Sequence, residues 1–177
     1  MIRLTGVKPC IAVVVVLVVG GACEERRTGV TRPPTSGVPT TEQVTAEVFT
    51  TDYGCGWEFV TGNEQGTWRL TIAAAVQAPI PAGHVDLEQA DVVATVTFGA
   101  DLFSNHCDDV IEAHEPTPRV VAEWPVVAGK FEMPPYDSSV AGPLTIVLRD
   151  GIVQTESGAI HLEPIEMDHG CYGCFPG

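Results

Sequence analysis

Basic side chains are scarce beyond residue 44. Residues 45–177 hold four fixed cations and 20 Asp and Glu side chains, a net charge of −16. The cations are Arg69, Arg119, Lys130 and Arg149. Nucleic-acid binding depends on Lys and Arg side chains that neutralise phosphates, so this composition excludes nucleic acid as a partner. A bare anionic membrane surface would also repel the segment, so attachment to a membrane requires an anchor.

The sequence also lacks the common catalytic motifs. It has no Gly-x-Ser-x-Gly elbow, no Walker loop and no Gly-x-Gly-x-x-Gly. His114-Glu115 is followed by Pro-Thr-Pro, which rules out a His-Glu-x-x-His helix. We therefore expect a non-catalytic protein. A secreted hydrolase with a carboxylate pair is the catalytic alternative, because so many acids always contain pairs.

The N-terminus has the three-part pattern of an export signal. Arg3 and Lys8 precede an apolar run at 10–19, and small residues follow at 20–22. Such a pattern predicts a secretory signal peptide over residues 1–22. The run is about half of the ~20 residues that a membrane-spanning helix needs.

Cys23 follows the small residues directly. Residues 19–23 resemble the lipobox of bacterial lipoproteins, in which this cysteine is acylated, although Gly20 stands where leucine is usual. Ordinary secretion with cleavage after Ala22 is the alternative. Removal of the signal peptide leaves five cysteines. The four later cysteines can pair with one another, so Cys23 has no partner, and acylation accounts for it. We expect an extracytoplasmic protein anchored to the cell membrane by lipid on Cys23.

A polar segment separates this cysteine from the rest of the chain. Residues 23–44 are rich in Thr, Pro, Gly and charge. Such a segment buries too little apolar area to offset its ordering entropy, so we expect a disordered, semi-extended tether. Residues 45–177 then form one domain, long enough for its own core, and we expect a monomer.

Apolar residues in this domain recur with a period of two. The alternation predicts strands at 67–77, 91–99, 119–127 and 143–149. Further strands are expected at 47–52, 57–61 and 159–167, the last broken or placed at an edge by Pro164. The fold class is therefore all-β, a single antiparallel β-sandwich of immunoglobulin-like shape, with an antiparallel barrel as the alternative.

Two local features refine this expectation. Asp150-Gly151 separates two strand-like runs and predicts a two-residue hairpin there, because both central positions of such a turn need positive φ. The helical candidate is short and spans residues 107–113.

Four cysteines remain in the domain, Cys55, Cys107, Cys171 and Cys174. A redox dithiol at Cys171-x-x-Cys174 would need a following helix to lower the thiol pKa, and too few residues follow. A zinc ribbon would need a second Cys-x-x-Cys. We expect structural disulfides. We favour one bond from Cys55 and one from Cys107 to the terminal pair, since a three-residue loop constrains the chain little.

The polar cluster around residues 101–115 offers candidate metal ligands. If Cys107 bonds Cys171, two imidazoles and several carboxylates come together and suit Zn²⁺ or Cu²⁺, whereas the carboxylates alone suit Ca²⁺. A solvated acidic loop beside a disulfide is the other interpretation. The candidate ligands of this divalent metal are His106, Asp108, Asp109, His114, Asp168 and His169.

The aromatic residues allow two interpretations. Trp57 and Phe59 share one strand face, so they would stack on sugar rings if that face is exposed. Trp68 and Trp124 lie among Val and Leu positions, which indicates the core.

Residues 101–110 and 123–125, together with Tyr-Gly-Cys-Gly at 53–56 and the ending at 173–177, resemble a group of uncharacterised secreted or lipid-anchored proteins of actinobacterial type. The group brings no known activity, so the resemblance implies no functional residues. It supports export and paired cysteines.

These features predict a lipoprotein whose domain binds or interacts outside the cytoplasm. We expect it to need no cofactor, and its ligand to be a protein, a cation or a glycan. A metal-binding protein that uses His106, His114 and His169 is the alternative from another class.

Overall fold

The computed structural model describes residues 43–104, 106–107, 114–137 and 142–174. Several expectations lie outside these residues: the signal peptide at 1–22, acylated Cys23, the tether up to residue 42 and the short helix beyond Cys107. They stay predictions.

Antiparallel strands dominate the described residues, and a short 3-10 helix, η2 (Ala46–Val48), precedes them. The strands are β1 (Thr51–Asp52), β2 (Glu58–Gly62), β3 (Trp68–Ala74), β4 (Gly83–Asp86), β5 (Val92–Ala100), β6 (Arg119–Met133), β7 (Gly142–Thr155), β8 (Gly158–Leu162) and β9 (Ile165–Tyr172).

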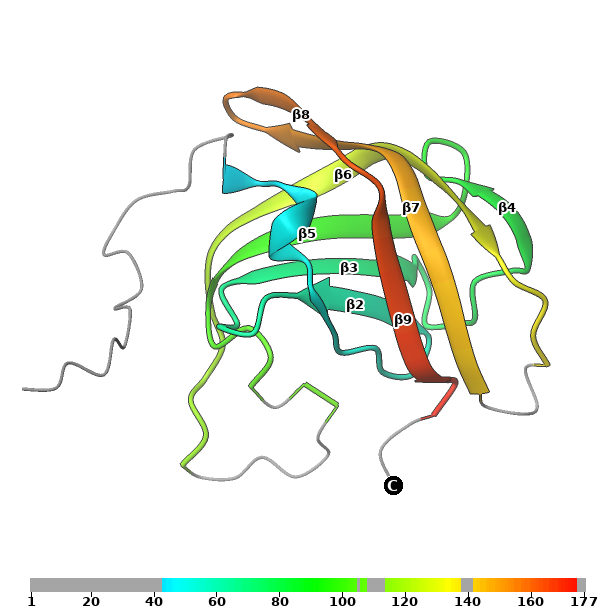
Figure 1. Cartoon of the computed structure of the whole chain (residues 1–177), viewed down its shortest axis with the longest axis horizontal. Coiled ribbons are helices and arrows are strands. Elements are labelled where there is room, and N and C mark those ends of the chain that lie inside the picture. Colours follow the sequence, from blue (N-terminus) through cyan, green and yellow to red (C-terminus); the bar gives the residue numbers. More distant parts are fainter. Residues whose placement is uncertain (1–42, 105, 108–113, 138–141, 175–177) are drawn as a thin grey trace, which may run out of the picture. The chain divides into compact units, whose positions relative to one another are not determined.

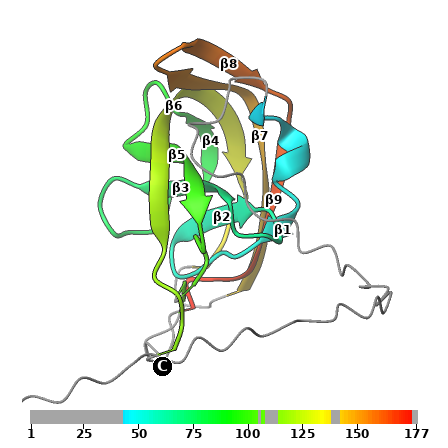
Figure 2. The same ribbon diagram turned by 90° about the vertical axis from the view of Figure 1, so that its left-hand side faces the viewer.

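The strands form two layers that pack face to face. One layer pairs β1, β2, β3, β5 and the first part of β6 in that order. In the other layer, β7 pairs with β9 and β8. Figure 1 shows β7 and β9 crossing over β2, β3 and β5, and Figure 2 shows the two layers from the side. The predicted all-β, antiparallel, sandwich-like fold is confirmed.

The two layers are joined through long strands and are not separate sheets. β6 pairs with β5 through residues 119–125 and then with β7 through residues 126–130. Pro125 stands where the partner changes. A proline offers no backbone N–H for a ladder, so the change of partner costs no hydrogen bond at this residue.

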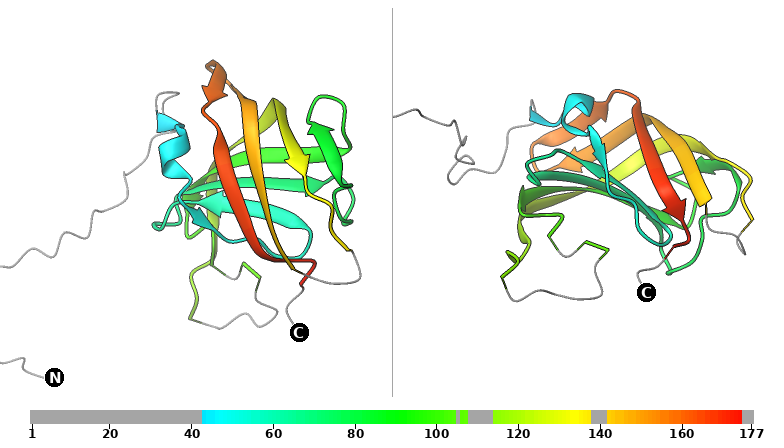
Figure 3. Two further views of the ribbon diagram at one scale, coloured as in Figure 1. Left: turned by 45° about the vertical axis from the view of Figure 1, so that its right-hand side comes forward. Right: turned by 60° about the horizontal axis from the view of Figure 1, so that its bottom comes forward.

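The second layer ends close to the start of the first. The left panel of Figure 3 shows β7 and β9 side by side across β2 and β3. β9 also contacts β2 directly. This crossing brings the C-terminal cysteines to the segment that leads into β2.

The predicted hairpin at Asp150-Gly151 is wrong. Both residues lie inside β7, which continues to Thr155. Asp150 has the expected positive φ of 53°, but here it forms a bulge at which the pairing with β6 shifts register. The hairpin lies at the end of β7, where the chain turns into β8 between the paired residues Thr155 and Gly158.

The core lies between the layers and draws on the inward face of every long strand. Trp68 and Trp124 are each 6% exposed, and their ring centroids are 6.2 Å apart, which confirms their predicted place in the core. Leu70 is fully buried, and truncating such a leucine to alanine costs about 2–5 kcal/mol. Val44, at the end of the predicted tether, is also buried.

Candidate functional site

The four cysteines of the domain form two pairs. Cys55 pairs with Cys107, with Cα atoms 5.7 Å apart, and Cys171 pairs with Cys174 at 5.4 Å. Both separations are normal for disulfides. The favoured connectivity, in which Cys55 and Cys107 each bond one terminal cysteine, is therefore wrong.

A tight turn explains the local pair. The Cys174 N–H donates to the Cys171 carbonyl at 3.0 Å, and Gly173 between them has φ 88°. Glycine adopts this backbone conformation without a steric penalty. The turn brings the two cysteines together. Backbone hydrogen bonds to Gly56, instead of a long-range disulfide, hold Gly173 and Cys174 in place.

The Cys55–Cys107 pair holds the loop after β5 against the segment before β2. Cys107 has φ 65°, which turns the chain back toward Tyr53. The rings of Phe103 and Tyr53 stack with centroids 3.6 Å apart. The His106 Nε2–H donates to the Tyr53 carbonyl at 2.8 Å, since a carbonyl oxygen can only accept. The loop is therefore fixed by a covalent bond, a ring stack and a hydrogen bond.

His169 lies in the core beneath this segment. It is 1% exposed, and its ring packs edge-on against Phe59 and Tyr172. The His169 Nδ1 atom accepts the Cys171 N–H at 3.3 Å. Burial lowers the pKa of His169 below its usual 6.5, and nearby His106 adds to the lowering, against the opposing effect of backbone hydrogen bonding at Cys55 and Glu58. The imidazole is therefore neutral at pH 7.

The structure separates the candidate metal ligands that it describes. His169 points into the core, whereas Asp168 points out from β9 and accepts a hydrogen bond from Thr145 at 2.5 Å. His106 is hydrogen-bonded to the Tyr53 carbonyl, and His114 is exposed. Asp108 and Asp109 lie outside the described residues. Within residues 43–174, gaps excepted, no three His, Cys, Asp or Glu side chains gather as a metal site.

A small group of carboxylates lies where β1 meets β9. Partial burial raises the pKa of Asp52 above its usual 3.8, and the carboxylates of Asp168 and Glu166 raise it further. Hydrogen bonds from the Asp168 backbone and the Thr61 side chain act in the opposite direction. This group does not line either of the two hollows described next.

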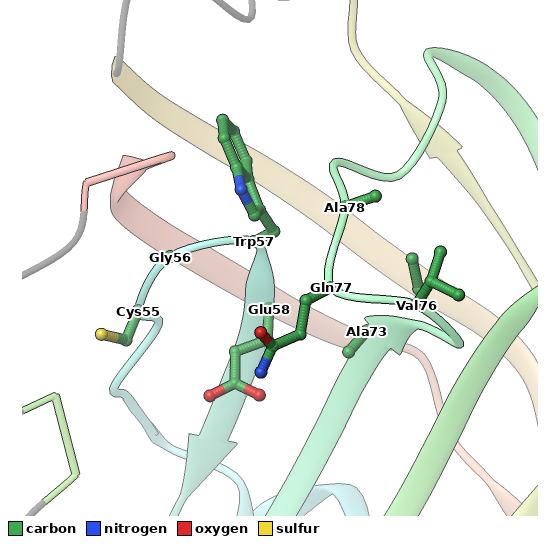
Figure 4. A pocket seen from close by; sticks show the side chains of 9 residues that line it. Cys55, Gly56, Trp57, Glu58, Ala73, Val76, Gln77 and Ala78 are labelled. Carbon is green, nitrogen blue, oxygen red and sulfur yellow. The ribbon is translucent and has the colours of Figure 1, made fainter.

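A cleft of about 340 Å³ opens at the start of β2 and the end of β3. Glu58 at the start of β2 pairs with Ala73 near the end of β3, so the segment before β2 faces the turn that follows β3. Figure 4 shows Glu58 and Gln77 among the lining residues, with the Trp57 indole at one end. The cleft is lined by Cys55, Gly56, Trp57, Glu58, Ala73, Ala74, Val76, Gln77 and Ala78.

Trp57 connects this cleft to the C-terminal turn. Its indole meets the Tyr172 ring edge-on, with centroids 5.2 Å apart. A Cβ atom at Gly173 would come within 2.5 Å of the indole, so only glycine lets the turn lie against Trp57. Trp57 is a predicted candidate for ligand stacking and lies in the turn before β2, whereas Phe59, its predicted neighbour on one strand face, lies in β2 and is fully buried.

The lining has one ionisable side chain outside the disulfide. That side chain is Glu58, and no Lys or Arg lines the cleft. Val76 in the lining is 64% exposed, and Val93, which pairs with Ala73 across β3 and β5, is 53% exposed. The cleft thus combines an aromatic ring, a carboxylate and an apolar surround.

A second hollow of about 250 Å³ lies at the start of β7. Its lining includes Tyr136, Leu144 and Tyr172. It adjoins residues 138–141, which the structure does not describe, so we build no site on it.

No protein family, curated protein or solved structure matches this chain. The resemblance to secreted actinobacterial proteins therefore stays a prediction. Among the described residues, no helix is long and apolar enough to cross a membrane.

Proposed function

We propose that this chain is a lipid-anchored, extracytoplasmic binding protein whose domain takes a small organic cation at the Trp57 cleft. The observation that carries the proposal is the lining of the cleft, which joins an indole and a carboxylate without a lysine or an arginine. The protein does no chemistry on this ligand.

Export is supported by the cysteines. All four cysteines of the domain pair at disulfide separations. Such bonds persist in oxidising compartments outside the cytoplasm. Anchoring is supported by the sequence around Cys23, since the strongly acidic domain would be repelled by an anionic membrane surface.

The ligand class follows from charge and ring chemistry. The face of a tryptophan attracts a cation within about 6 Å of the ring centroid. The Glu58 carboxylate supplies an opposite charge at the same cleft, and the net charge of −16 on residues 45–177 favours approach of a cation and opposes that of an anion. A volume of about 340 Å³ falls at the small end of ligand pockets and suits a small molecule.

Choline and its uncharged carbon analogue test this proposal. Calorimetric titration of the full chain should show choline binding at least about tenfold more tightly than the analogue, because only choline carries the charge. Equal binding of the two molecules, or no saturable binding of choline, would refute the proposed ligand class.

Two variants place the site. Trp57→Ala and Glu58→Gln should each weaken choline binding by about tenfold, which corresponds to about 1.4 kcal/mol. Glu132→Gln makes the same chemical change on an exposed side chain of β6 and should leave binding unchanged. If Glu132→Gln weakens binding as much as Glu58→Gln, the effect is one of overall charge and the cleft is not the site.

A further inference from the structure

We propose that Cys171–Cys174 is an exchange-competent disulfide, which an extracytoplasmic dithiol protein reduces and which re-forms without unfolding of the domain. This proposal rests on the export part of the proposed function and is independent of the ligand in the cleft. Four features of the described structure carry it.

The first feature is the small span of the bond. Cys171 and Cys174 are three positions apart, whereas Cys55 and Cys107 are 52 apart and join a loop to the sheet. A disulfide that closes a very short loop constrains the chain little. Opening Cys171–Cys174 therefore releases little structure, whereas opening Cys55–Cys107 frees the loop that carries Phe103 and His106.

The second feature is access. Cys174 is exposed, whereas Cys55, Cys107 and Cys171 are partly buried. Thiol–disulfide exchange needs approach of a thiolate to one sulfur, so its rate depends on access to that sulfur. Cys174 Sγ is therefore the atom that an incoming thiolate reaches first.

The third feature is that other contacts hold the turn. The Gly56 N–H donates to the Cys174 carbonyl at 2.9 Å, and the Gly173 N–H donates to the Gly56 carbonyl at 2.7 Å. Tyr172, between the cysteines, is 2% exposed, and its hydroxyl accepts the Ile80 N–H at 2.9 Å. Both thiols therefore keep their places after reduction and can pair again.

The exchange balances without a cofactor. A thiolate of the partner attacks Cys174 Sγ and forms a mixed disulfide, while the Sγ–Sγ bond breaks and its electron pair leaves on Cys171 Sγ, which takes up a proton. The second thiolate of the partner then attacks its own mixed-disulfide sulfur and releases Cys174 as a thiolate, which is also protonated. The partner dithiol is oxidised to a disulfide, and this chain gains two thiols.

The roles in this reaction are unequal. An attacking cysteine is usually activated at a helix N-terminus or beside a basic group. Within the described residues, Cys171 lies in a β-strand and Cys174 in the turn that follows it. This chain thus supplies the disulfide that receives the attack, and the partner supplies the activated thiolate.

The fourth feature is the contact of the turn with a residue that lines the cleft. Gly173 lies against the Trp57 indole, which forms one end of the cleft. The redox state of the pair is therefore expected to change the surroundings of a tryptophan. Reduction of the pair should therefore be visible as a change in tryptophan emission.

Trypsin makes the two pairs separately measurable. Cleavage after Arg27, Arg69, Arg119 and Arg149 places Cys55 in peptide 28–69, Cys107 in peptide 70–119, and both terminal cysteines in peptide 150–177. The oxidised full chain is exposed to dithiothreitol for increasing times, alkylated and digested, and the alkyl groups on each peptide are counted by mass spectrometry.

Peptide 150–177 should gain two alkyl groups at least about tenfold faster than peptides 28–69 and 70–119, because Cys174 is the accessible sulfur. The circular dichroism of the chain should stay unchanged through this phase while its tryptophan emission shifts. The double variant Cys55→Ser/Cys107→Ser should exchange at the same rate, if it folds. The double variant Cys171→Ser/Cys174→Ser, which keeps the turn contacts, should lose the fast phase entirely.

Reduction of both pairs together, or reduction only with loss of the fold, would overturn the exchange proposal and leave export intact. Four free thiols in the chain as isolated from membranes would overturn export and the exchange together. The two failures are distinguishable, because the first is measured during reduction of the oxidised chain and the second before any reductant is added.

Discussion

His169 illustrates, at the scale of a single residue, how a polar position becomes part of the core. Its neighbours in sequence favoured a surface metal site with Asp168. Alternation along β9 places Met167 and His169 inside and Asp168 outside, so adjacent candidates face opposite ways. Two residues that are adjacent in a strand therefore point their side chains to opposite faces of the sheet.

The pH dependence of stability tests this placement. The folded pKa of His169 is lowered, so just below pH 6.5 the unfolded chain binds more protons than the folded chain. Stability should be complete above about pH 6.5 and should fall as the pH falls toward the folded pKa. In His169→Phe this contribution should disappear, although loss of the acceptor for the Cys171 N–H costs about 1 kcal/mol at every pH.

Urea unfolding at several pH values between 7 and 5 measures the effect. His161 is exposed on β8, so His161→Phe makes the same chemical change at the surface and should keep the wild-type pH dependence. Identical pH dependence in the wild type and in His169→Phe would show that folding does not lower the pKa of His169, and would contradict its burial in the core.

At the scale of elements, alternation located most strands but could not predict their lengths or partners. The patterns at 67–77 and 91–99 correspond to β3 and β5, and Pro164 separates β8 from β9 as expected. β6 and β7 each extend well past their predicted ends. Their continuation depends on a change of pairing partner between layers, which is a long-range property that no local pattern contains.

The Asp150-Gly151 error has a local physical reason. A tight hairpin and a bulge both need a residue with positive φ, and Asp150 supplies it in either structure. Only the pairing of residues on both sides of Asp150 with β6 distinguishes the two. The four-residue strand β4 was missed for a similar reason, because its short pattern has meaning only beside β6.

The two cysteine pairs should differ in their contribution to stability. Chain-entropy reasoning gives about 4 kcal/mol for the Cys55–Cys107 bond, which spans 52 positions, and about 1–2 kcal/mol for the three-position Cys171–Cys174 bond. Urea unfolding of the double variants Cys55→Ala/Cys107→Ala and Cys171→Ala/Cys174→Ala, without reductant, measures both. An equal or larger loss in the terminal variant would contradict these pairings.

At the scale of the whole molecule, the export and anchoring proposals rest on composition and on the number of cysteines. The position of the cleft cannot be predicted from the sequence alone. The sequence predicts Trp57 as a candidate for ligand stacking because it is aromatic, but no sequence pattern places it near Gln77 or Ala73. The register between β2 and β3 brings these residues to one cleft. Glu58 was one of 20 acids in this part of the chain and became distinct only through its position.

The lipid anchor and the domain chemistry predict different properties of the same chain. The anchor depends on Cys23, and the domain depends on four other cysteines. An exported chain therefore has a modified first residue and no free thiol in the domain. A chain that stays in the cytosol has neither property.

The intact mass of the chain, taken from cells that produce it and alkylated before and after reduction, tests export and anchoring most directly. We expect a product in the membrane fraction that begins at Cys23, carries the mass of a lipid, and gains four alkyl groups only after reduction. A product in the cytosol that begins at Met1 and gains alkyl groups on its cysteines before reduction would contradict the account.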